Sequence, residues 1–424
     1  MRKVVSIIII ILTLSSLLLT GCKDSSEVDD NVYAVAIGLD KGINNKVMVT
    51  IQYPIYMQTK GEDKGSEIGI NGIGANVHSI EGPSMLECIN LMNMAISRRI
   101  SLLHTKMLVI SEDFAKEGIG EFLSPLARFR GVRRTMFVIV TKGTAASFMQ
   151  ENKTNIGPSL TKSIELMMAQ SKNTGFFPPE NFHDFYRDIL STYGNSIAIY
   201  AGLNQGKSIQ LEGGKRESKL VIEKDIKPGE MPRIGTAKRE FVGSALFNGD
   251  KMVGSLNPYE TRYMMMVKGE FRQGIMTIED KKSPGSGIIV SIRNGRPPKI
   301  NAKFENGKPV VDINLNIEAD IGAIHSRINY ESLNLIKNLD KQLQEEIKNG
   351  VEKVIEKTKK EYKTDVFQFG KKFAGYFPTI QKWEDYHWLL HYPETKVNVN
   401  VVVNVRRTGL MLNSSPIIER PNIK

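Results

Sequence analysis

The sequence predicts an α+β fold with several domains, in which mixed sheets carry helices on their faces and the chain closes with an antiparallel sheet and one long helix. The chain has 424 residues, which is too long for a single hydrophobic core. Strand and helix patterns alternate in its first half, whereas hairpin signals and a long amphipathic stripe dominate the second half. Apolar residues make up 41% and charged residues 24% of the chain, a composition typical of globular proteins.

The first 21 residues have the features of a lipoprotein signal peptide. A basic start is followed by residues 4–19, which carry no charge and are fewer than the ~20 residues of a membrane span. Residues 19–22 then read LTGC, so that small residues precede a cysteine. We therefore expect lipidation of Cys22, with residues 22–30 as the tether of the folded body. The alternatives are a cleaved secretory peptide with an incidental cysteine, or an uncleaved anchor helix.

Residues 31–204 are expected to form an N-terminal mixed α/β region. Two alternating segments around a turn-rich stretch, residues 32–40 and 46–54, indicate a β-hairpin. Buried strands and amphipathic helices then alternate, which favours a sheet with helices packed on it. The further elements expected here are strands over 104–111, 133–141 and 198–203, and helices behind Ser84 and over 114–129, 158–170 and 178–191.

A stretch rich in Gly, Lys, Glu and Pro, residues 205–235, is the clearest shift of composition in the chain and is predicted to be a linker. It separates the N-terminal region from a C-terminal α+β region over residues 236–410. That second region could divide into two subdomains near residue 283. Residues 411–424 are expected to form a tail.

The C-terminal region is expected to combine hairpins with one long helix. Asn294-Gly295 and Asn306-Gly307 are strong hairpin signals between successive strands. Residues 330–362 carry apolar side chains at steps of three and four, which predicts an amphipathic helix on the face of the closing sheet. This stripe comprises Leu333, Ile336, Leu339, Leu343, Ile347, Val351 and Val354. The expected strands cover 239–248, 251–256, 287–293, 299–305, 309–319 and 396–407, and two shorter helices cover 365–377 and 378–390.

No residue pattern for catalysis, cofactor binding or metal binding is found, so the sequence predicts none of these sites. His387 and His391 have the spacing of a zinc pair, but no glutamate stands between them and no third ligand is evident. We expect these histidines to cap or line a helix. Cys88 has no partner once Cys22 carries lipid, so no disulfide framework is expected and a buried apolar role is favoured.

The formal net charge of +11 is spread along the chain and does not indicate a nucleic-acid interface. An exported protein does not meet nucleic acid, and no aromatic-basic RNA signature is present. Positive charge beside an anionic bilayer adds a weak attraction. No segment after the signal peptide has 18 uncharged apolar residues, so we expect a body that lies outside the membrane.

Four stretches behind the LTGC sequence, taken together and in order, resemble the Ger(x)C family, the lipoprotein C subunits of spore germinant receptors. Each stretch is modestly specific, whereas their combination is highly specific and covers nearly the whole mature chain. The stretches are VYAVAIGLDKG with the strand end at residues 52–54; the helix from Ser84 with residues 99–104 and MLVISEDFAKEGIG; REFVGSALFNGDKMVGSLNPYET; and DVFQFGKKF with Trp383, Trp388 and the closing valine strand.

The resemblance implies a lipid-anchored exodomain on the outer face of the inner spore membrane, assembled with two integral membrane subunits, A and B. It implies three mixed α/β domains and no catalytic residues, and it carries over Cys22 alone, as the lipidation site. The leading hypothesis is therefore a non-catalytic C subunit of a nutrient receptor. The alternatives are a substrate-binding lipoprotein of an ABC importer and a surface lipoprotein enzyme.

Contact with the A and B subunits would need hydrophobic surface that folding does not use. Phe176-Phe177 and Tyr386 to Trp388 are the candidate aromatic residues for such a surface. The alternative is that they are ordinary core residues, which we favour slightly for the tryptophan.

Overall fold

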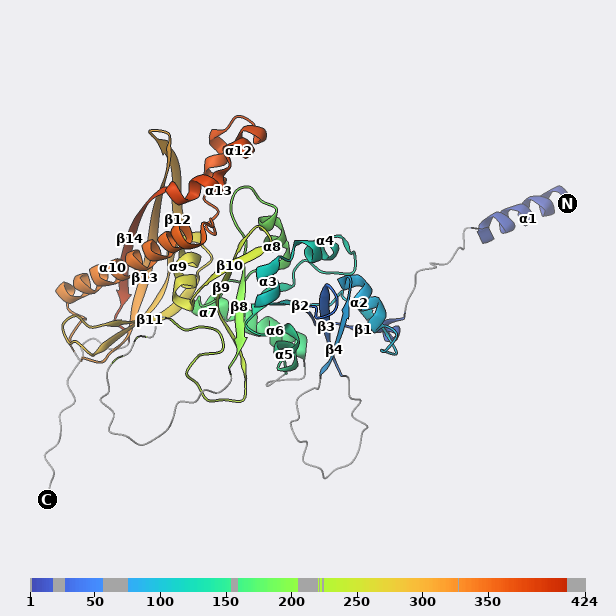
Figure 1. The fold of residues 1–424 in the computed structure, drawn as a ribbon, viewed down its shortest axis with the longest axis horizontal. Helices are drawn as coiled ribbons and strands as arrows, with labels where there is room; N and C mark the ends of the chain where they lie inside the picture. Colours follow the sequence, from blue (N-terminus) through green and yellow to red (C-terminus); the bar gives the residue numbers. More distant parts are fainter. Residues whose placement is uncertain are drawn as a thin grey trace, which may run out of the picture.

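The computed structural model describes residues 2–17, 27–55, 75–153, 159–204, 220, 222, 225–326 and 328–409. Figure 1 shows an elongated body in which an eight-stranded sheet with helices on both faces lies beside a four-stranded sheet with one long helix along it. The N-terminal helix α1 (Arg2–Leu17) stands apart from this body. Within the described ranges, no helix is both long enough and apolar enough to cross a membrane.

The eight-stranded sheet has the order β10-β9-β8-β7-β6-β2-β3-β4 and is mixed. Its centre, from β2 through β6 and β7 to β8, is parallel, and its two ends are antiparallel hairpins. The predicted hairpin at the start of the chain is present as β2 and β3, whereas β4 was not expected. The strands are β2 (Ala36–Lys41), β3 (Val47–Pro54), β4 (Ala75–Gly82), β6 (Met107–Ser111), β7 (Phe137–Thr141), β8 (Ile197–Leu203), β9 (Arg239–Asn248) and β10 (Lys251–Leu256).

Helices cover both faces of this sheet and bury two separate hydrophobic clusters. Alternate residues of one strand reach opposite faces, since Ile37 belongs to one cluster and Ala36 to the other. One face is covered by α2 (Met85–Met92), α3 (Glu112–Glu117), α4 (Gly120–Arg128) and α8 (Phe182–Ile189), and the other by α5 (Ala145–Gln150) and α6 (Leu160–Ala169). Short α7 (Ser171–Thr174) follows α6. The expected layer of sheet and helices is confirmed.

The eight-stranded sheet continues across the predicted linker. β9 pairs with β8 in antiparallel register, with Ile197 opposite Leu246, and β10 extends the sheet beyond β9. Most of residues 205–235 lies outside the described residues. Residues 239–256 therefore share a sheet with the first half of the chain, and the division into domains near this linker stays a prediction.

The C-terminal sheet has the order β11-β12-β13-β14 and differs from the expected antiparallel sheet in its last strand. β11 (Gln273–Glu279), β12 (Gly287–Glu305) and β13 (Lys308–Ile324) are antiparallel neighbours, but β14 (Lys396–Arg407) runs parallel to β13. The prediction of a wholly antiparallel sheet was wrong for a topological reason. Residues 333–394 form a long helical crossover that returns the chain to the same end of the sheet, and such a connection produces a parallel pair.

Only one of the two Asn-Gly pairs forms a hairpin turn. Asn306 and Gly307 have φ angles of 51° and 78° between β12 and β13, as a two-residue turn requires. Asn294 and Gly295 lie inside β12, where the register with β13 shifts between Asn294 and Arg296. The Asn294 amide donates to the carbonyl of Phe271 at 2.8 Å, so this pair forms a bulge and the predicted turn there was wrong.

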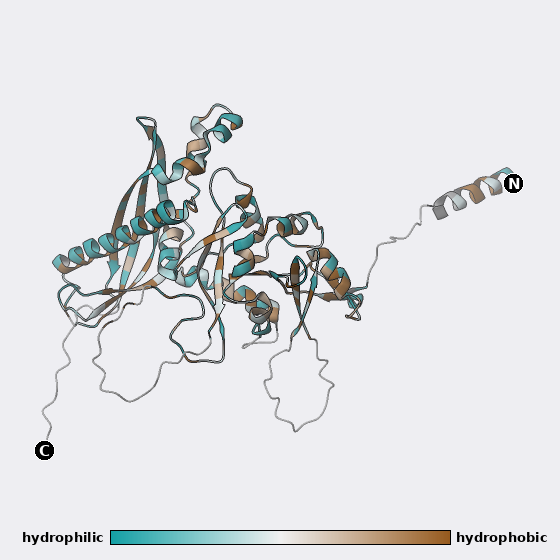
Figure 2. Cartoon of the chain, viewed as in Figure 1, coloured by the Kyte–Doolittle hydropathy of each residue, from teal (hydrophilic) through white to brown (hydrophobic). Residues whose placement is uncertain are grey.

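The predicted long helix is present as α10 (Leu333–Lys357), which continues as the π-helix η2 (Thr358–Tyr362). It packs on β14 and on α9 (Pro258–Lys268), and Figure 2 shows that its outward side is hydrophilic. The stripe is buried from Leu339 through Leu343, Ile347 and Val351 to Val354.

The segment between α10 and β14 contains shorter helices than expected. It is divided into α11 (Gly370–Phe373), η3 (Ala374–Tyr376), α12 (Ile380–Tyr386), α13 (Trp388–His391) and η4 (Tyr392–Glu394). His387 has a φ of 50° and interrupts the helical run between α12 and α13. The two predicted helices are therefore a series of short helices packed around Trp383 and Trp388, which are each 1% exposed.

Arg262 of α9 connects α7 to β11 from a buried position, with 2% of its surface exposed. Its Nε and Nη2 donate to the Thr174 carbonyl at 3.0 and 2.6 Å, and its Nη1 donates to the Ile275 carbonyl at 3.0 Å. Its guanidinium also lies 4.3 Å from the centre of the Phe176 ring. Burial lowers the Arg262 pKa to about 10. One side chain thus ties the segment after α6 to both α9 and β11.

Leu343→Ala should lower the free energy of unfolding by about 2–5 kcal/mol, because Leu343 is fully buried between α10 and the sheet. Equilibrium denaturation measures this change. Lys341→Ala, at an exposed position of the same helix, is the matched control and should change it by less than about 0.5 kcal/mol. Similar small losses for both variants would mean that the stripe does not carry the packing of α10.

Glu180→Gln should remove a pH dependence of stability. Burial raises the pKa of Glu180 to about 8, and its Oε1 has no hydrogen-bond partner among the described residues. The folded protein then holds a proton that the unfolded chain loses above pH ~4.5, so the wild type should lose stability relative to the variant between pH ~4.5 and ~8, by up to about 1.4 kcal/mol per unit. Parallel unfolding curves of both proteins at pH 5 and pH 8 measure the difference. A constant gap between them would contradict the burial of a protonated carboxyl.

Candidate functional site

The chain enters its folded body at a small two-stranded sheet. Cys22, the predicted lipidation site, lies outside the described residues. The turn η1 (Val28–Asp30) leads into β1 (Asn31–Tyr33), which pairs in parallel with β5 (Arg99–Ser101). We call β1, β5 and residues 93–98 the anchor end. Any tether that starts at Cys22 must reach the body here.

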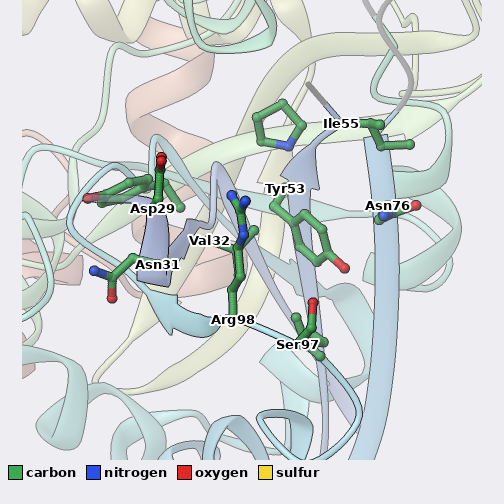
Figure 3. Close-up of a pocket in the computed structure, with 11 residues that line it drawn as sticks. Asp29, Asn31, Val32, Tyr53, Ile55, Asn76, Ser97 and Arg98 are labelled. Atoms are coloured by element: carbon green, nitrogen blue, oxygen red, sulfur yellow. The ribbon is translucent and has the colours of Figure 1, made fainter. Parts of the chain in front are cut away.

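A cleft of about 860 Å³ opens at the anchor end, beside β1 and the ends of β3 and β4. Figure 3 shows Arg98 extending between Asp29 and Tyr53. The Tyr53 hydroxyl contacts His78 Nε2 at 3.0 Å, and the two rings are stacked with centroids 5.6 Å apart. The cleft is lined by Asp29, Asn31, Val32, Tyr33, Tyr53, Pro54, Ile55, Asn76, Ile96, Ser97 and Arg98.

The cleft is lined by charged, polar, aromatic and aliphatic side chains. Its lining mixes one guanidinium, one carboxylate, amides and aliphatic side chains. Ser97 makes no hydrogen bond to an acid or base in the described ranges, so it has no activating partner there. Arg98 forms no ion pair with a described carboxylate and is free to meet an anion. The cleft can hold a polar or anionic group beside the tether.

The two histidines of the predicted pair, His387 and His391, have structural contacts. His387 caps α12, and the ring of His391 stacks on Tyr386 at 4.4 Å between centroids. Among the described residues, no group of three or more His, Cys, Asp or Glu side chains is placed to hold a metal ion. Cys88 is fully buried, and burial raises the pKa of its thiol, which keeps it protonated and unreactive.

Of the aromatic candidates for a subunit contact, Phe177 is a core residue, so the expectation of exposed surface was wrong for it, and the core role favoured for Trp388 is confirmed. Phe177 is 5% exposed and Trp388 is 1% exposed, and Trp388 stacks on Phe373 at 4.7 Å. Phe176 is half-buried beneath Arg262. Tyr386 is half-buried against His391. Their burial is needed for folding and leaves little surface for a partner.

Asp365 is one of several buried acids, and its contacts give it a structural task. Its Oδ2 accepts hydrogen bonds from Trp388 Nε1 at 2.9 Å and from the Gly370 backbone at 3.1 Å. Its backbone N–H donates to Asn195 Oδ1 at 2.8 Å. Burial raises its pKa to about 6. Asp365 thus fixes the helical turns before β14 against the segment before β8.

An arginine-rich segment, made of the last residue of α4 and the loop that follows it, was missed at the sequence level. Residues 128–134 read RFRGVRR, with four arginines in seven residues and no acid. Arg128, Arg130, Arg133 and Arg134 are all exposed, and Phe129 between them is 44% exposed. The run of four arginines in residues 128–134 could have revealed this segment in the sequence. It was overlooked because the positive charge was judged over the whole chain, where it is evenly spread. We call residues 128–134 the arginine loop.

Comparison with known proteins identifies the fold and the family. The "Spore germination protein N-terminal domain" matches residues 24–202, and "Spore germination B3/ GerAC like, C-terminal" matches residues 242–409. The crystal structure of the GerBC protein superimposes with a TM-score of 0.51 and 16% sequence identity, over 87% of this chain and 96% of that chain. The predicted α+β fold is thereby confirmed.

Curated relatives match along nearly the whole chain. Spore germination protein KC of Bacillus subtilis (strain 168) is 24% identical, over 95% of this chain and 96% of its own length. Spore germination protein YndF of the same strain is 23% identical over 94% and 96%, and GerQC of Bacillus cereus is 22% identical over 95% and 98%. Together with the two domain matches, these full-length similarities place the chain in the GerAC-like family of spore germination C subunits.

Proposed function

We propose that this protein is a non-catalytic, lipid-anchored C subunit of a nutrient germinant receptor and is required for spore germination. The observation that carries this proposal is the similarity to spore germination proteins along the whole chain, from residue 24 to residue 409. The proposed place of the body is the outer face of the inner spore membrane. The proposed partners are the integral membrane A and B subunits.

A scaffolding role agrees with the chemistry of the described residues. The buried Asp365 and Arg262 are used in joining parts of the fold, and the cleft at the anchor end has no activated nucleophile. Such groups stabilise one arrangement of the body. We therefore propose that this subunit does not turn over the nutrient.

A tether explains how the body would meet its partners. Residues 23–30 can span at most roughly 28 Å when extended, so lipid on Cys22 would keep the anchor end close to the bilayer. This confinement raises the effective concentration of the body toward membrane proteins without new contacts. Binding to A and B subunits would then need only modest intrinsic affinity.

The importer alternative fits the fold less well. A substrate-binding lipoprotein of that class is expected to have two doubly wound parallel domains. Here the C-terminal sheet has two antiparallel pairs, and β14 alone is parallel to its neighbour. Neighbouring reading frames that encode multi-span membrane proteins, instead of an ATPase and a permease, would support the receptor.

Cys22→Ala should abolish lipid attachment and move the protein from the detergent phase to the aqueous phase. The physical reason is that two acyl chains on one residue anchor stably, while the described body has no membrane-spanning helix. Phase partitioning of protein expressed without A and B subunits measures this, because partners cannot then retain the variant. Spores that carry Cys22→Ala should respond poorly to the nutrient.

Cys88→Ala is the matched control, since Cys88 is the other cysteine of the chain and is buried in the core. This variant should stay in the detergent phase. Retention of Cys22→Ala in the detergent phase without partners would overturn the lipid anchor, and unchanged germination of its spores would show that the anchor is not needed.

A further inference from the structure

The arginine loop concentrates unpaired positive charge on one small surface. Arg128, Arg130 and Arg133 are exposed, and in the described part of the chain none of them forms an ion pair. The fourth, Arg134, donates from Nη2 to the Ala127 carbonyl at 2.9 Å and closes the loop on itself. Three guanidinium groups therefore remain available to an outside anion, and each can bind a phosphate with two hydrogen bonds.

Phe129 adds an apolar group to the centre of this charge. Its side chain is 44% exposed although it is a large aromatic residue. A Cβ atom on Gly131 would lie only 2.6 Å from its ring, so the ring rests on the backbone of the loop tip. An exposed aromatic ring between arginines is typical of segments that lie at the boundary between lipid headgroups and acyl chains.

The arginine loop lies in the same part of the body as the anchor end. Val132 of the loop and Ile100 of β5 belong to one hydrophobic cluster, and α2 packs against α4. Figure 1 shows α4, α2 and β1 together at the end of the body nearest α1. Lipid on Cys22 would therefore bring this loop toward the bilayer.

The arginine loop is one source of attraction to an anionic surface at this end of the body. The tether side of the anchor end carries acids, with Asp29 and Asp30 both exposed before β1. Lys46 of the same sheet is paired with Glu121 at 2.6 Å, whereas Arg98 and Arg99 at the anchor end are exposed and form no ion pair with a described residue. The arginine loop thus adds a dense group of unpaired arginines to the unpaired Arg98 and Arg99 of the anchor end.

We propose that the arginine loop is a docking surface for the phosphate headgroups of anionic phospholipids and orients the body on the bilayer. This inference rests on the proposed lipid anchor for bringing the loop to a membrane. A lipid anchor alone fixes one point and leaves the body free to rotate about the tether. A second contact through arginines and one aromatic ring fixes the orientation, and each cation adds attraction to an anionic leaflet.

Vesicle binding by the chain that starts at residue 23, without lipid, tests the proposal. Its fold should be retained, because all members of the three hydrophobic clusters lie between residues 32 and 405. This chain should co-sediment with phosphatidylglycerol vesicles at low salt and not with phosphatidylcholine vesicles. The triple variant Arg128→Gln, Arg130→Gln and Arg133→Gln should bind about a hundredfold more weakly, and Phe129→Ala roughly tenfold more weakly.

The matched control removes the same charge from the far end of the body. Lys337, Lys341 and Lys353 are exposed on α10 and form no ion pair with a described residue. Their triple substitution by Gln should leave vesicle binding unchanged. Equal losses for both triple variants would reduce the effect to net charge and overturn the docking surface.

Two further results would overturn it. One is equal binding to phosphatidylglycerol and phosphatidylcholine vesicles. The other is binding to soluble poly-glutamate without binding to anionic vesicles, which would assign the loop to an acidic protein. Because this chain carries no lipid, a negative vesicle result would not contradict the lipid anchor at Cys22. A negative result of the Cys22→Ala test would likewise not contradict vesicle binding by the arginine loop.

Discussion

The arrangement of the two sheets depends on one buried guanidinium. Arg262 has no carboxylate partner among the described residues, so its charge is stabilised by the carbonyls of Thr174 and Ile275 and by the face of Phe176. An isolated buried charge is costly unless its hydrogen bonds are satisfied. Separation of the sheets would remove an acceptor and leave the cation unsatisfied. The joint is also packed with apolar side chains, because residues of both sheets, such as Leu246 and Ile278, belong to one hydrophobic cluster.

The connection between the two sheets matters because the proposed bilayer contacts lie at one end of the body, away from the place where the sheets meet. β9 and β10 complete the first sheet from the far side of the predicted linker, and Asp365 secures the segment before β8. The anchor end and the arginine loop both contribute residues to one core cluster, Ile100 and Val132. A bilayer contact at this end would consequently fix where α10 and the C-terminal sheet stand. Partner subunits would then meet a defined face of the body.

Sequence reasoning found the parts of the fold that depend on local patterns. The stripe of α10 and the turn at Asn306 follow from side-chain periodicity and backbone preference within a few residues. It missed the parallel direction of β14 and the bulge at Asn294, because both are decided by pairing with strands far along the chain. The core placement of Trp388 was only slightly favoured, since an aromatic residue suits a core and an interface alike. The lipidation of Cys22 could be predicted because its sequence pattern spans only a few residues. The proximity of the arginine loop to β5 could not be predicted, because the two segments meet only in the folded structure.

Charge placement separates the two ends of the molecule. The tether region is acidic at Asp29 and Asp30, the arginine loop is basic, and α10 carries lysines among glutamates along its outer face. Salt reduces attraction between exposed charges over about 10 Å, so dense charge matters more than net charge at a membrane. A net charge of +11 spread evenly would bind anionic lipid weakly in any orientation. Three unpaired arginines around Phe129 select one orientation, and this selection is what a subunit that acts by contact needs.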